Sequence, residues 1–184
     1  MAVIMVSYQA TPTDMRTIKR KEIIMKTAAL LAAIFLVPYM TYANQFTNVN
    51  ALQGLKIVKV ICDVNIGDPK LLLRRMELID ETYTQLIDAG IQPTFIVAFR
   101  GPASKYVTRG TGYVPPRHQA VKKEIQGWIA QFHENGFSLE QCAIAARGQN
   151  VSYGDILPQI TVVRNGYISI VAYQSKGYAL LPMD

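Results

Sequence analysis

The pattern of apolar and polar positions predicts a strand, a helix and a second strand in the middle of the chain. Residues 55–64, LKIVKVICDV, are rich in β-branched side chains and stop at a Gly-Asp-Pro turn, which is typical of a strand. From 70 to 89 apolar residues recur at three- and four-residue steps and Gly90 follows, which predicts an amphipathic helix with a glycine stop. The nearly continuous apolar run at 92–99, QPTFIVAF, predicts a strand buried on both faces, as in a parallel sheet. Together they form a βαβ unit, which should be right-handed.

The rest of the chain continues this alternation after one irregular stretch. The 20 residues at 100–119 contain three glycines and three prolines, which predicts a long loop or lid. Helical spacing returns from 121 to 132 and ends at Asn135-Gly136. The remaining expected elements are a strand at 137–141, a helix at 142–147, a strand at 161–163, a helix at 167–175 and a last short strand at 178–181.

Alternating strands and helices predict a three-layer α/β/α sandwich with a mainly parallel sheet. Ligands of such sheets bind at the carboxyl ends of the strands. This rule places residues 63–68, 100–117 and 141–147 along one edge. Cys142 belongs to the third of these stretches.

The amino-terminal segment predicts export. The apolar stretch from Ala28 to Met40 has 13 residues, fewer than the roughly 20 that a membrane-spanning helix needs. Basic residues precede it and small residues follow it, so we expect a signal peptide at 25–43 that is cleaved after Ala43. The mature protein is then a single periplasmic domain, 44–184, with no stable membrane span. Residues 1–24 are interpreted as an extension upstream of the true start. The alternative to a cleaved signal peptide is an uncleaved amino-terminal anchor with a cytoplasmic extension.

Charge and histidine content argue against several classes of function. The whole chain has a net charge of +6, but residues 44–184 have 14 Lys and Arg against 11 Asp and Glu, a net charge of +3. These charges do not cluster, so no nucleic-acid partner is expected. His118 and His133 have no second ligand at helical spacing, and the sequence predicts neither a metal site nor a cofactor.

Cys142 is the main candidate for chemistry. It lies where a predicted strand meets a predicted helix, and a helix amino terminus stabilises a thiolate. Arg147, together with Arg100 or Arg109 from the predicted loop, would add positive charge around the sulfur and attract an anionic donor. Packing in the core and a disulfide with Cys62 are the alternatives, and the residues alone leave them open.

The order of motifs resembles that of the DsrE/DsrF-like family, in particular its exported members, over nearly all of 54–183. The motifs are VNIGDPK, ENGFSLEQC, DILPQITVVRNG and QSKGYALL. The resemblance implies a three-layer sandwich in a flavodoxin-like strand order and a homo-oligomer, either a trimer or a hexamer. Relay members of the family carry sulfur as a persulfide on one cysteine after the third strand, and Cys142 matches that position.

The resemblance therefore implies a sulfur carrier or sulfurtransferase that works with a donor or acceptor protein. Membership alone does not establish transferase chemistry. The alternative is a non-catalytic, oligomeric protein that binds a small ligand or has a structural role.

Overall fold

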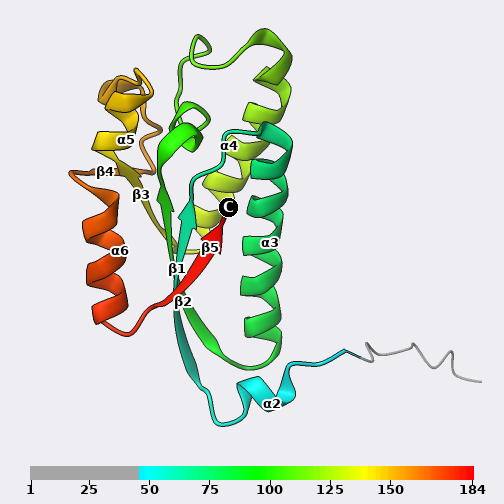
Figure 1. The fold of residues 1–184 in the computed structure, drawn as a ribbon. Coiled ribbons are helices and arrows are strands. Elements are labelled where there is room, and N and C mark those ends of the chain that lie inside the picture. The colour runs from blue at the N-terminus through cyan, green and yellow to red at the C-terminus, as the bar shows by residue number, and fades with distance from the viewer. Residues whose placement is uncertain (1–45) are drawn as a thin grey trace, which may run out of the picture. The chain divides into compact units, whose positions relative to one another are not determined.

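A computed structural model describes residues 46–184; the predicted extension at 1–24 and signal peptide at 25–43 lie outside them. Strands and helices alternate along the described residues (Figure 1). The elements are α2 (Val49–Leu52), β1 (Ile57–Val64), α3 (Pro69–Asp88), β2 (Gln92–Phe99), the short 3-10 turns η1 (Gly101–Lys105) and η2 (Pro116–His118), α4 (Gln119–Glu134), β3 (Ser138–Cys142), α5 (Ala143–Gly148), the 3-10 turn η3 (Tyr153–Asp155), β4 (Thr161–Val163), α6 (Gly166–Ser175) and β5 (Ala179–Met183).

The five strands form one parallel sheet between two layers of helices. The strand order is β4-β3-β2-β1-β5, and every neighbouring pair is parallel. Figure 1 shows α3 and α4 on one face of the sheet and α6 on the other. The structure confirms the predicted α/β/α class.

The strand order itself differs from the expected flavodoxin-like order, which is 2-1-3-4-5. Here the chain moves outward from β1 through β2 and β3 to β4, and then returns to place β5 on the other side of β1. Right-handed crossovers in one direction put their helices on one face, and a crossover in the reverse direction puts its helix on the opposite face. The return to β5 therefore explains why α6 lies apart from α3 and α4.

The larger core lies between the sheet and helices α3 and α4. Most of the apolar positions predicted for both helices point into it, but Ile87, near the end of α3, is 46% exposed. Three aromatic rings stack there, with Phe137 5.0 Å from Phe95 and 4.9 Å from Phe132 between ring centroids. A smaller core under α6 contains Ile170 of that helix and apolar residues of β1 and β2. No helix of the described residues is long and apolar enough to span a membrane.

The connection at 100–119 is irregular, as predicted, but it is not a loose lid. Val107 and Thr108 have no exposed surface. Lys122 of α4 is 3% exposed and donates hydrogen bonds to Thr108 Oγ1, at 2.6 Å, and to the carbonyl oxygen of Gly110. A lysine ammonium thus holds this segment against the body of the domain, and its burial lowers the pKa of Lys122.

Candidate functional site

Cys142 lies at the junction that the sequence predicted. It is the last residue of β3 and the N-cap residue of α5, with extended backbone angles of φ −68° and ψ 117°. Only 4% of its surface is exposed. Its thiol makes no capping hydrogen bond to α5.

The amino end of α6 packs directly against this cysteine. Gly166 is the first residue of α6, and a Cβ atom placed on it would lie 3.0 Å from the Cβ of Cys142. Real Cβ atoms rarely approach that closely, so the backbone of α6 reaches Cys142 only because residue 166 has no side chain. The positive end of the α6 dipole therefore faces the region of the thiol.

The topology explains why a strand end and a helix start meet here. β3 continues into α5, whose Ala146 belongs to the core with α3 and α4, whereas β4 leads into α6 on the opposite face. Neighbouring strands whose connections leave toward opposite faces create a crevice at their carboxyl ends, where open α/β sheets bind ligands. Cys142 and Gly166 lie at this switch point.

Arg100 is the predicted arginine that reaches the same place. It is 8% exposed, and its Nε and Nη2 donate hydrogen bonds to the two carboxylate oxygens of Asp63, each at 2.6 Å. Its guanidinium stacks on Tyr167, 4.2 Å from the ring centroid, and its Cδ and Cγ lie 3.0 and 3.2 Å from the Cβ position of Gly166. The bond to Asp63 raises the pKa of Arg100 above its ordinary value. The stem of Arg100 and Cys142 thus flank Gly166, and Asp63 balances much of the arginine's charge.

The other two predicted arginines have contacts elsewhere. Arg147 is exposed on the last turn of α5, the end opposite to Cys142, where it lines an open hollow. Arg109 donates from its Nη2 to the carbonyl oxygen of Gly154, and its backbone N–H donates to the carbonyl oxygen of Asp155 at 2.7 Å. The structure therefore brings together Cys142 and Arg100, while a role for Arg147 or Arg109 at the thiol stays a prediction.

Glu140 lies on the same face of β3 as Cys142, two residues earlier. Its Oε1 accepts a hydrogen bond from the Tyr173 hydroxyl of α6 at 2.9 Å, and its buried Oε2 has no partner. Burial, followed by the bond to Glu140, raises the pKa of Tyr173 to about 12. Alternate residues of a strand are about 7 Å apart, so a negative charge on Glu140 opposes a thiolate at Cys142.

The disulfide alternative does not fit the sheet. Both cysteines are free thiols. β2 separates β1 from β3, which puts the two strands roughly 10 Å apart, beyond the limit of about 7 Å between bridged Cα atoms. Cys62 also packs in the core under α3 and α4, on the other face of the sheet, and burial raises its pKa to about 12.

The sequence did not single out Gly166 or Tyr167 as site residues, and it placed Asp63 at this edge only as part of the stretch 63–68. Asp63 had a detectable signal, because it is a lone carboxylate in an apolar strand. The importance of Gly166 depends on a contact between segments that the sequence alone does not align. Among the described residues, no group of three or more His, Cys, Asp and Glu side chains is placed to hold a metal ion.

Comparison with known proteins supports the fold. No family model matches the chain. An uncharacterized protein of Aquifex aeolicus (strain VF5) is 24% identical over 126 residues, which are 68% of this chain and 56% of that protein, so the chain spans little more than half of this relative. The structure of MTH1491, a protein of unknown function from Methanobacterium thermoautotrophicum, matches with a TM-score of 0.55 and 17% identity over 68% of this chain and 98% of that one. The ychN protein from E. coli gives a TM-score of 0.46 and 15% identity over 70% of this chain and 98% of that one. The likeness to MTH1491 agrees with the α/β fold.

Proposed function

We propose that this chain is an exported DsrE-like protein that handles sulfane sulfur as a persulfide on Cys142. The observation that carries the proposal is the packing of the amino end of α6 against Cys142, with the stem of Arg100 beside it. The position of Cys142 at the end of the third strand agrees with the motif resemblance. The place of Cys142 at a topological switch point adds a reason for a ligand to bind there, because open α/β sheets bind ligands at such points.

The proposed step transfers one sulfur atom. The Cys142 thiolate attacks the outer sulfur of a donor such as thiosulfate; a new S–S bond forms, the S–S bond of the donor breaks, and sulfite leaves with the bonding electrons. A thiolate of an acceptor then attacks the outer sulfur of the persulfide, and the Cys142 thiolate is regenerated. The α6 dipole favours the anionic sulfur in both steps, Arg100 adds only the charge that Asp63 leaves unbalanced, and Glu140 opposes the anion. Because Cys142 is 4% exposed, the donor must be small.

The proposed compartment is the periplasm. A signal peptide at 25–43 would be removed there, leaving Asn44 as the mature amino terminus. Sequencing the amino terminus of the protein recovered from a periplasmic fraction tests this directly. Recovery of a chain that still begins at Met1 or Met25 would contradict export with cleavage.

Self-association is proposed through the outer face of α6. Tyr167, Ile168 and Val171 are each 63% exposed, so this helix presents apolar side chains to solvent. A second copy of the chain, in a trimer or hexamer, would cover them. Ile168→Lys should shift the mass measured by light scattering toward the monomer, whereas Ile87→Lys, at an exposed position of α3, should leave it unchanged.

The second candidate function is a non-catalytic oligomeric binding protein. The low exposure of Cys142 favours it, since a thiol that only packs is typically buried. In that case Cys142 should resist small sulfur donors until the protein unfolds.

Loading experiments on three proteins separate the two candidates. The wild-type protein is incubated with thiosulfate or hydropolysulfide, its intact mass is measured, and dithiothreitol is then added. We expect a reversible gain of one sulfur atom in the wild type and in Cys62→Ser, and no gain in Cys142→Ser that retains its circular dichroism spectrum. Sulfur loading of a folded Cys142→Ser, or none in the wild type, would contradict the proposal.

A further inference from the structure

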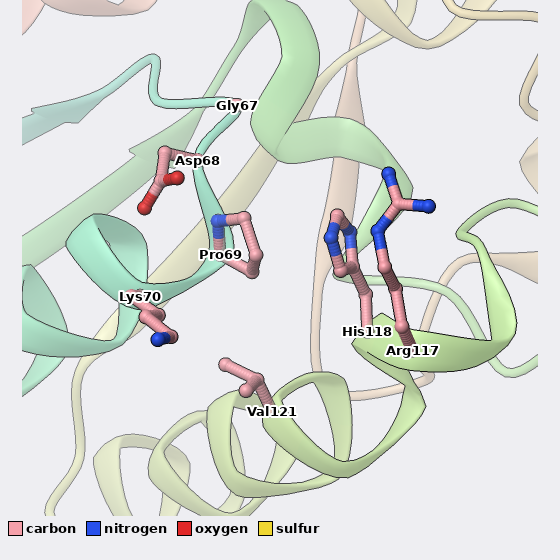
Figure 2. Close-up of a pocket in the computed structure, with 7 residues that line it drawn as sticks. All are labelled: Gly67, Asp68, Pro69, Lys70, Arg117, His118 and Val121. Carbon is pink, nitrogen blue, oxygen red and sulfur yellow. The ribbon is translucent and has the colours of Figure 1, made fainter.

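A hollow lies between the amino ends of α3 and α4, and none of its lining residues belongs to the site around Cys142. It has a volume of about 500 Å³, within the range of small-molecule pockets. Figure 2 shows Asp68, Pro69 and Lys70 on one side and Arg117 and His118 on the other. Gly67 and Val121, from the loop before α3 and the first turn of α4, complete its lining.

The charges around this hollow favour an anion. The amino end of a helix carries a partial positive charge, and acidic residues are normally placed there. Neither α3 nor α4 has an acidic residue in its first turn. Lys70 instead lies in the first turn of α3, and Arg117 and His118 directly precede α4. Two helix amino ends and two permanent cations therefore give this hollow a positive potential, which Asp68, the N-cap of α3, partly offsets.

Asp68 is the carboxylate of the lining, and it offsets only part of this charge. Its Oδ1 accepts the backbone N–H of Leu71 at 2.8 Å, so it caps α3. Lys70 and Arg117 leave one positive charge in excess. The lining thus has the charge balance of a site for an anion.

His118 is held in place as a donor to this hollow. Its Nδ1 lies 3.2 Å from the Tyr106 hydroxyl, which is also 3.3 Å from the carbonyl oxygen of Gly67. The Tyr106 hydroxyl has one proton, and donating it to Nδ1 of His118, the shorter of the two contacts, leaves the imidazole proton on Nε2. Nε2–H can then donate to a ligand. Tyr106 is 4% exposed, and its ring stacks on His118 with the centroids 6.5 Å apart, which fixes the imidazole.

We propose that this hollow binds a small molecule through one oxyanion group, such as a phosphate or sulfonate. Arg117, Lys70 and Nε2 of His118 bind the oxyanion, and the apolar surfaces of Pro69 and Val121 contact the rest of the molecule. This site is independent of sulfur chemistry, so it stands whether or not Cys142 carries a persulfide.

Titrations with phenyl phosphate and with inorganic phosphate test the site. Binding is measured by calorimetry and by the imidazole NMR signals of His118. Phenyl phosphate should bind more tightly than inorganic phosphate because it adds the apolar contact, and benzylamine should not bind. The double variant Lys70→Gln/Arg117→Gln should weaken phenyl phosphate binding at least tenfold. Its matched control, Lys56→Gln/Lys176→Gln, removes the same charge at the amino-terminal end of the strands and should bind as the wild type does.

A gain-of-affinity variant makes the test sharper. Asp68→Asn keeps an N-cap residue of similar strength but removes the carboxylate, so phenyl phosphate should bind about fivefold more tightly. The inference is overturned if the two double variants weaken binding equally, if Asp68→Asn leaves affinity unchanged, or if His118 signals do not respond to phenyl phosphate.

Discussion

Replacing Gly166 with alanine tests the packing at the start of α6. The added Cβ would meet the Cβ of Cys142 and the Cδ of Arg100 at 3.0 Å each, and the Cγ of Arg100 at 3.2 Å. Neither neighbour can move freely. The Cβ of Cys142 is attached to a strand, and the Arg100 guanidinium beyond the stem is fixed by Asp63 and the ring of Tyr167.

The expected cost follows from two opposing effects. Overpacking in a filled site costs about 1–3 kcal/mol. Replacing glycine by alanine in a helix gains up to about 1 kcal/mol, and less in the first turn. We therefore expect Gly166→Ala to lose about 1–2 kcal/mol of unfolding free energy.

Urea denaturation followed by circular dichroism measures this loss, with Gly127→Ala as the matched control. Gly127 lies within α4, and a Cβ added there meets no atom within 4 Å. The same substitution should stabilise the protein by about 0.5–1 kcal/mol at that position. If Gly166→Ala is as stable as the wild type or more stable, the close contact between α6 and Cys142 is refuted.

Three further predictions concern the charges and thiols around the site. Glu140→Gln should increase the rate at which sulfur donors modify Cys142, measured by mass spectrometry, because it removes a nearby negative charge; an unchanged rate would mean that this charge does not act on the thiol. Arg100→Met should lose about 2–3 kcal/mol in urea denaturation, because it leaves the carboxylate of Asp63 unpaired at 19% exposure, and the double variant with Asp63→Leu should recover most of it. Burial raises the pKa of Cys62 from 9.0 to about 12, so the folded protein keeps the thiol proton and the free energy of unfolding falls as pH rises from 9 toward 12. The urea midpoint of Cys62→Ala should therefore fall less over that range than the midpoint of the wild type. Midpoints of the two proteins that fall in parallel would contradict the raised pKa of Cys62.

Local pattern was sufficient to predict the five strands and the helices between them, but not the four-residue helix α2. The bounds of β2 and β4 agree with the predicted 92–99 and 161–163, and α3 begins one residue earlier than expected because Pro69 takes the first helical position. Apolar spacing reports the face that each element buries, and turn residues mark where it ends. The layer architecture follows from that alternation.

Contacts between distant segments were not predictable in the same way. Asp63 and Arg100 are 37 residues apart, and their pairing depends on the register of β1 and β2. Among three arginines of equal charge, the sequence could not show that the stem of Arg100 packs beside Gly166 and Cys142, because that contact joins three separate segments. The sequence also could not predict the strand order, because the last strand can join either edge of the sheet without changing the pattern of apolar residues.

The proposed function depends most on Cys142 as the thiol that accepts sulfur. The most direct measurement is peptide mapping by mass spectrometry of the folded wild-type protein after brief exposure to thiosulfate or hydropolysulfide, with the two cysteine peptides quantified in the same sample. We expect one added sulfur atom on the Cys142 peptide and none on the Cys62 peptide. Added sulfur on both peptides in equal amounts, or on neither before unfolding, would contradict a reactive site at the start of α6.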